Sequence, residues 1–210
     1  MGINKPYVRN CRTFIDGSHT ESGKLKYVRH PTPMYAKNAL GCIFPFLLLQ
    51  KDFINLLDYI EPSNTNLKTY SFRIHELFVR SCIEIESFCR TILKENSYGR
   101  EDKKEMRMDD YKKLEKSHML SEYQIKPQRW EGDKSIYRPF ESWKNEGSLD
   151  WYKAYHSVKH NPHNDFREAN FKNLINAICG VAVLLSSQFY TEDFSSDRSI
   201  LIEGNDIDDG

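Results

Sequence analysis

The side chains best suited to chemistry gather in one short segment, Trp151 to His163. It reads Trp-Tyr-Lys-Ala-Tyr-His-Ser-Val-Lys-His-Asn-Pro-His and contains His156, His160 and His163. An imidazole titrates near neutral pH and can pass a proton to or from a reacting oxygen. Because His156 and His160 are four residues apart, a helix places both rings on one face. The spacing predicts an acid–base site at a helix end, where the unpaired carbonyls of the last turn favour a protonated His160.

A structural interpretation of the same segment is equally open. The histidines and Lys159 then cap and decorate the helix end, which favours cations. The aromatic side chains Trp151, Tyr152 and Tyr155 pack against neighbouring helices. The sequence does not decide between an acid–base role and this structural one.

Zinc binding is the third interpretation, since two histidines four residues apart and a following Asp165 are suitable ligand types. It is less favoured, because Ser157 stands where the helical zinc-protease motif carries its catalytic Glu. We therefore expect no metal site and no cofactor.

Hydrophobic periodicity predicts the helices that position this segment. The expected spans are 46–60, 67–94, 149–160 and about 165–190. The third ends before Pro162, which lacks an N–H to continue it. The second carries an apolar seam suited to bundle packing, formed by Ile74, Phe78, Ser81, Ile85, Phe88 and Ile92.

The last predicted helix has two notable positions. Asp165 followed by Glu168 resembles a capping box at its start. Gly180 lies in its interior, where glycine is unfavourable, and so indicates the close approach of another helix. That helix can belong to a second subunit.

The domain organisation follows from these spans. The chain is expected to be all-α, an up-and-down bundle over 45–190, with a connector or insertion at 97–147 between the second and third helices. Residues 1–44 form an irregular arm, and 191–210 an acidic, flexible tail. Two short alternating runs in the arm predict a strand pair, Tyr7–Phe14 and Lys24–Val28.

Composition excludes several classes of protein. Hydrophobic residues make up 39% of the 210, enough for a core, and thirty basic side chains balance thirty acidic ones, so no overall basic field attracts nucleic acid. Five scattered cysteines fit a reducing compartment. The apolar runs Ala39–Leu49 and Leu174–Tyr190 are too short or too polar for a membrane span. A soluble cytoplasmic protein is expected, with no membrane association.

The helix reading Glu76-Leu-Phe-Val-Arg-Ser-Cys-Ile-Glu-Ile-Glu-Ser-Phe-Cys-Arg90, the later Trp-Tyr-x-x-Tyr-His-x-Val-Lys-His-Asn and the final apolar helix together resemble the HEPN superfamily over about 46–190. The family is a helical bundle, commonly dimeric. Many members are metal-independent endoribonucleases of toxin–antitoxin and phage-defence systems. The resemblance therefore implies RNA or a nucleotide as ligand, a homodimer, and an antitoxin or other defence protein as partner.

The family motif is an Arg, a polar residue, and a His four to six residues beyond the Arg. His160 takes the His place, His156 the polar place, and Tyr155 stands at the Arg position. The resemblance implies that His160 and His156 are catalytic. Because the motif Arg is missing, we expect other residues to contact the substrate: Lys159, Arg80, Asn161, His163 and Arg167. Glu84, Tyr152 and Tyr155 are expected to give structural support.

The tyrosine at position 155 leaves three functions open. In the first, the protein cleaves RNA with another cation in place of the motif Arg. In the second, a non-catalytic HEPN-like module binds a nucleotide, nucleic acid or protein partner through the same groove. In the third, the chain is a structural or regulatory helical dimer.

Overall fold

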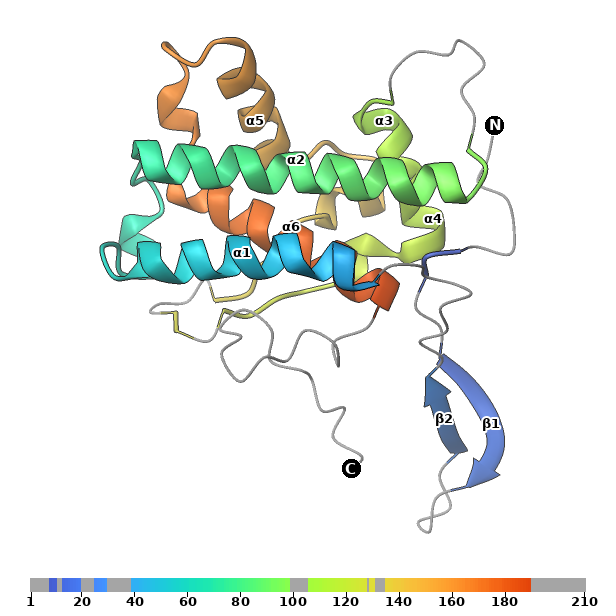
Figure 1. Ribbon diagram of the computed structural model, residues 1–210. Coiled ribbons are helices and arrows are strands. Elements are labelled where there is room, and N and C mark those ends of the chain that lie inside the picture. Colours follow the sequence, from blue (N-terminus) through green and yellow to red (C-terminus); the bar gives the residue numbers. More distant parts are fainter. Residues whose placement is uncertain are drawn as a thin grey trace.

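Four long helices form the bundle (Figure 1). This computed structural model describes residues 8–10, 13–19, 25–29, 39–98, 106–127, 129–130 and 135–189. The long helices are α1 (Ala39–Leu57), α2 (Phe72–Glu95), α5 (Asp150–His160) and α6 (Phe171–Phe189). In Figure 1, α1 and α2 run in opposite directions side by side, with α6 behind them. The expectation of an all-α helical bundle is confirmed.

Helix α2 presents its predicted seam to the core. All six seam side chains are buried, from Ile74 to Ile92. The helix starts at Phe72, later than predicted, and the Ser71 hydroxyl caps it by accepting from the Ile74 N–H at 3.2 Å. Residues 67–70 lie outside the helix because they pair with the chain that enters α6: Lys172 N–H donates to the Leu67 carbonyl.

Helix α1 starts earlier than predicted. It begins at Ala39 and runs through Pro45, so the expected arm boundary at residue 44 is wrong. A proline inside a helix costs a backbone hydrogen bond, but its φ is compatible with helical geometry. Burial on both sides of the proline offsets that cost, since one face of α1 carries buried side chains throughout: Ile43, Phe46, Leu49, Phe53 and Leu56.

The start of α6 also differs from the prediction. Asp165 does not cap it, because a 3-10 turn at Phe166–Glu168 intervenes and the helix begins at Phe171. Asn170 is the cap, its Oδ1 accepting from the Asn173 N–H at 3.1 Å. Asp165 instead accepts a hydrogen bond from the Ser157 hydroxyl of α5 at 2.6 Å.

Gly180 is a point of close approach within the chain. A Cβ at this position would lie 3.1 Å from Ile85 Cδ1 of α2 and 3.5 Å from Phe140 Cζ. The glycine is therefore explained by α2 and Phe140 of the same chain, and the suggestion that it faces a second subunit is wrong.

The connector between α2 and α5 covers part of the core. It contains the short helices α3 (Met108–Tyr111) and α4 (Glu115–His118) and a 3-10 turn at Glu141–Asn145. Several of its large side chains are buried in the same cluster as the long helices: Tyr111, Leu114, Leu120, Phe140 and Trp143. The described part of the connector thus belongs to the bundle.

The N-terminal region contains an antiparallel strand pair, β1 (Thr13–His19) and β2 (Leu25–Arg29). Thr13 pairs with Arg29, and the register shifts between Ile15 and His19. The second strand lies where it was predicted, while the first starts later, because Val8–Asn10 is in bends that contact the bundle. The predicted acidic tail, 191–210, lies outside the described residues.

None of the described helices combines the length and apolarity that a membrane crossing requires.

Enlarging Gly180 should destabilise the monomer fold. We expect Gly180→Leu to lower the free energy of unfolding by about 1–3 kcal/mol, because its side chain must displace Ile85 and Phe140. Urea denaturation followed by circular dichroism measures the change. Gly180→Ala is the control and should have a smaller effect, since only the flexible end of Ile85 has to move. Equal stability of Gly180→Leu and the wild type would contradict this account.

Candidate functional site

The exposed histidine pair consists of His156 and His160 on α5. Their rings stack with centroids 5.2 Å apart and planes inclined by 29°, so the two residues share a face as their spacing predicts. The helix ends directly after them, where Asn161 N–H donates to the Ser157 carbonyl at 2.8 Å. His163 is exposed in the following turn. Imidazoles in this position are open to solvent and to a ligand.

Tyr155, the residue at the motif arginine position, points into the core. It is 1% exposed, and its ring meets Phe78 edge-on and lies 5.5 Å from the Tyr152 ring. Burial, with a contribution from the Glu86 carboxylate, raises the pKa of Tyr155 to about 12. Tyr155 is a neutral residue packed in the core. Any side chain at position 155 of α5 would point into the bundle.

Tyr152 connects α5 to α2. Its hydroxyl donates to Glu86 Oε1 at 2.6 Å. Burial, reinforced by the hydrogen bond to this carboxylate, raises the pKa of Tyr152 above its ordinary value. The bond joins α5 to α2 on the buried face of α5, which also carries Tyr155, and His156 and His160 lie outside this face.

The cations expected to assist His160 have other partners. Arg80 Nη1 lies 2.6 Å from Asp52 Oδ2, which directs the guanidinium toward α1. The Arg167 guanidinium carbon lies 5.5 Å from the centre of the Tyr70 ring, and Lys159 Nζ lies 5.3 Å from that of Tyr155.

Glu84, one turn beyond Arg80 on α2, is partly buried. Burial raises the pKa of its carboxyl group, and the nearby Arg80 charge opposes that shift. Asn161, also expected at the substrate, accepts a hydrogen bond from the Asn164 side chain at 3.1 Å. Of the predicted residues, the structure brings together His156 and His160, with Tyr152 and Tyr155 beneath them. Arg80 is directed toward Asp52 and Arg167 toward Tyr70.

A second group near the end of α5, which we call the aromatic end cluster, was not predicted. It consists of four residues: Tyr70, Phe72, His75 and Phe166. The centroid of the Phe166 ring lies within 6.1 Å of the centroids of the other three rings. Phe72 is 83% exposed. Burial lowers the pKa of His75, which favours a neutral ring.

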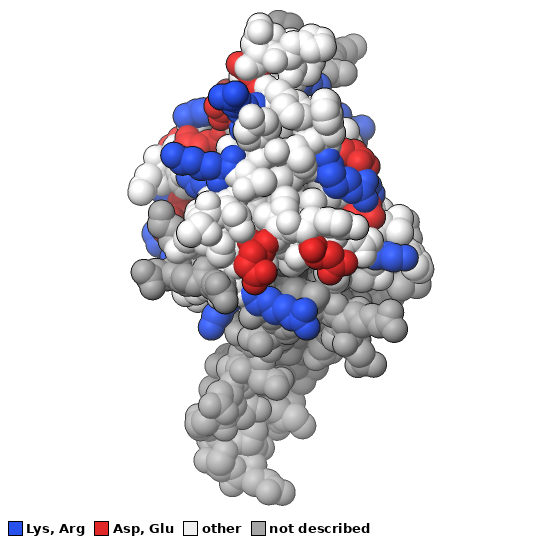
Figure 2. All heavy atoms as spheres, turned by 90° about the vertical axis from the view of Figure 1, so that its left-hand side faces the viewer, with Lys and Arg blue, Asp and Glu red and all other residues white. Residues whose placement is uncertain are grey.

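The aromatic end cluster lies at the end of the bundle that faces the viewer in Figure 2. The middle of this surface is largely uncharged, with Asp and Glu side chains just below it and Lys and Arg side chains toward its margins. An open hollow of about 410 Å³ lies next to the end of α1 and is lined partly by Asp58 and Glu61, which do not suit a phosphate. The exposed rings are therefore the more suitable surface for a nucleotide.

Metal binding finds no support in the described part of the chain. No three His, Cys, Asp or Glu side chains come together there in a group that could hold an ion. The histidine pair lacks a third ligand among these residues.

A buried histidine, His118, lies beside the N-terminal segment and was not predicted from the sequence. Its Nε2 lies 2.6 Å from the Arg9 carbonyl oxygen, which can only accept, so Nε2 donates the proton. Nδ1 is then free to accept from the Ser117 hydroxyl at 2.7 Å. Burial lowers the pKa of His118 to about 4; the carbonyl hydrogen bond opposes this shift and the Arg9 charge adds to it.

Stability should therefore fall in mild acid. The pKa of His118 is about 4 in the folded chain against 6.5 for an unperturbed histidine, so the unfolded chain binds the proton more readily. The contribution is complete above pH 6.5 and is lost as the pH falls toward 4, by about 2 kcal/mol at pH 5. Urea denaturation at pH 7.5 and pH 5 measures this loss.

His118→Gln tests the assignment, since a glutamine keeps a donor but does not titrate. The variant should lose about 2 kcal/mol less than the wild type between the two pH values. The exposed His160→Gln is the matched control for a histidine-to-glutamine substitution at the surface. An unchanged slope in His118→Gln would show that another group is responsible.

Comparisons with protein-family models, with curated proteins and with solved structures found no match to this chain.

Proposed function

We propose that this chain is a HEPN-like helical module that binds RNA or a nucleotide without cleaving it. The ligand would lie at the end of the bundle that carries the histidine pair and the aromatic end cluster. The observation behind the proposal is the burial of Tyr155, which is 1% exposed at the position of the motif arginine. Position 155 cannot offer a cation to a scissile phosphate, and Arg80 is ion-paired with Asp52.

The exposed rings supply a physical basis for binding. Nucleobases stack on aromatic side chains with about 1–3 kcal/mol per base, largely regardless of sequence. Phe72 and Tyr70 are 83% and 42% exposed, and the Phe166 ring contacts both of their rings. Arg167, on Tyr70, and the histidine pair offer hydrogen-bond donors to phosphate oxygens.

Metal-independent cleavage of RNA is the second candidate. It is favoured by the stacked and exposed His156 and His160, since one imidazole can donate a proton while the other accepts one. A cation from a position other than 155 would have to steady the phosphate. A homodimer, which the family resemblance implies, could supply it from a second copy.

The biological setting rests on the same resemblance. A cytoplasmic homodimer that works with an antitoxin or another phage-defence protein is the setting we propose. Recovery of a specific partner with the tagged protein from its own host would support it.

RNA binding should depend on the aromatic end cluster. We expect Phe72→Ala to weaken binding of a fluorescein-labelled RNA by about tenfold or more, because one stacking surface is lost. Fluorescence anisotropy in EDTA measures the dissociation constant. Phe44→Ala removes a phenylalanine that is 61% exposed on α1 and is the matched control; its affinity should be that of the wild type.

The same RNA separates the two candidate functions. End-labelled RNA incubated with the protein in EDTA should remain intact on a denaturing gel. Cleavage that is abolished by His160→Ala would replace the binding proposal by the nuclease. If the protein neither binds nor cleaves RNA or a nucleotide, both candidate functions are ruled out and a structural dimer is left.

A further inference from the structure

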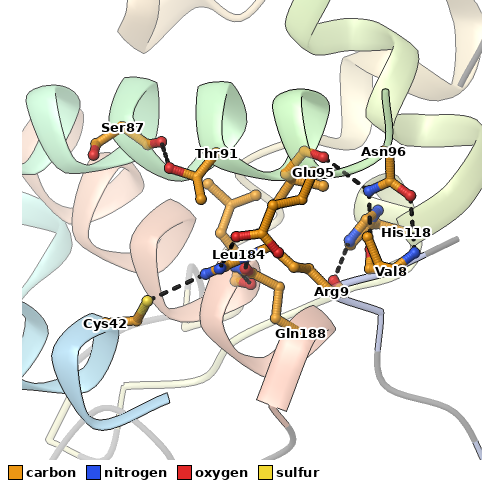
Figure 3. A network of polar contacts seen from close by, with 11 residues as sticks. Val8, Arg9, Cys42, Ser87, Thr91, Glu95, Asn96, His118, Leu184 and Gln188 are labelled. Carbon is orange, nitrogen blue, oxygen red and sulfur yellow. Dashed lines mark hydrogen bonds and ion pairs between the residues drawn. The ribbon is translucent and has the colours of Figure 1, made fainter. Parts of the chain in front are cut away.

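Arg9 lies in a buried polar site formed by the ends of three long helices (Figure 3). The residue is 3% exposed. Its Nε donates to Gln188 Oε1 of α6 at 2.7 Å, its Nη1 to Glu95 Oε1 of α2 at 2.9 Å, and its Nη2 to Cys42 Sγ of α1 at 3.2 Å. The Phe189 ring lies 5.5 Å from the guanidinium carbon. Each nitrogen of the guanidinium group therefore has a partner.

The backbone next to Arg9 is bound as a strand partner would bind it. The Asn96 side chain accepts from the Val8 N–H at 2.8 Å and donates to the Val8 carbonyl at 2.9 Å. This pair of bonds copies the pairing of a neighbouring β-strand, a mode of peptide recognition in which hydrogen bonds to the peptide main chain supply affinity.

Two more contacts continue along the segment. His118 Nε2 donates to the Arg9 carbonyl, and the Asn10 side chain donates to the Ser117 carbonyl. Arg9 has a φ of 54°, the left-handed region that non-glycine residues seldom adopt. The contacts on both sides of it hold the residue in that conformation.

Among the described residues, the partners of the segment come from the bundle. Those named above begin at Cys42, which is 33 residues away, and extend to Gln188. The site therefore recognises three consecutive residues by side-chain charge and main-chain hydrogen bonds. These contacts do not depend on the covalent connection between the segment and α1.

We propose that this end of the bundle is a binding site for an arginine-centred peptide, and that a second copy of the chain can fill it with its own Val8–Asn10. That segment is the occupant because it satisfies the site in this structure and is present on every copy. Exchange of an identical element between copies adds no new type of contact. The chain's own segment competes at a high effective concentration, so exchange is observed when that segment is disabled.

The first experiment uses the full-length Arg9→Ala chain as receptor. Its probe is a fluorescein-labelled peptide with the sequence of residues 4–10, Asn-Lys-Pro-Tyr-Val-Arg-Asn. We expect saturable binding by anisotropy. A peptide with Ala at the arginine position should bind about tenfold or more weakly, and one with Lys should also bind less well, because an ammonium cannot address three partners in a plane.

The receptor is tested by a matched variant, in which Arg9→Ala is combined with Glu95→Ala and Gln188→Ala. It should not bind the peptide. If the Arg9→Ala chain is unfolded on its own, addition of the unlabelled peptide should restore its helical circular dichroism. The absence of both binding and restoration would overturn the proposal. Equal binding of the Arg and Ala peptides would overturn it as well.

Exchange between copies is tested by mixing two differently tagged full-length chains. One is Arg9→Ala, with an intact site, and the other carries Glu95→Ala and Asn96→Ala, with an intact segment. Their mixture should form a one-to-one complex beyond any association that either variant shows with itself. An unchanged association overturns the exchange. The result does not depend on RNA, so it is independent of the function proposed above.

Discussion

Helix α6 is buried on nearly every side, and the other elements are arranged around that requirement. From Leu174 to Phe189 it carries no charged side chain, and most of these residues are inaccessible to water. A helix that is apolar all round must be covered all round. Helices α1, α2 and α5 cover three sides, and the connector with Phe140 and Trp143 adds to the cover. The approach of Ile85 to Gly180 shows how closely α2 lies against it.

This burial explains which parts of the fold follow from the sequence. The seam of α2 and the span of α5 are governed by apolar spacing and by Pro162, both of which are local signals, and they were predicted closely. The starts of α1 and α6 were not. Pro45 indicates a helix end by its local chemistry, but burial on both sides of it carries the helix through. Asp165 is of a residue type that caps helices. Its carboxylate instead accepts from the Ser157 hydroxyl, and a 3-10 turn separates it from α6.

The candidate site divides in the same way. The shared face of His156 and His160 follows from a spacing of four, and the structure shows it. The aromatic end cluster joins residues near position 70 to Phe166, and the arginine site joins Arg9 to Gln188, so each depends on how distant segments meet. No periodic pattern marks such contacts. The inward direction of Tyr155 agrees with the structural interpretation of the segment, in which this side chain packs against neighbouring helices.

The cysteines of the bundle differ in their accessibility and therefore in their reactivity. Cys82, Cys89 and Cys179 are inaccessible, and burial raises the pKa of each thiol, so they stay protonated and unreactive at neutral pH. Cys42 is half-buried, and its sulfur accepts from Arg9. Among the four cysteines of the described chain, alkylation by a thiol reagent thus distinguishes the rim of the arginine site from the interior. Covalent labelling followed by mass spectrometry becomes a footprint of whether that rim is closed.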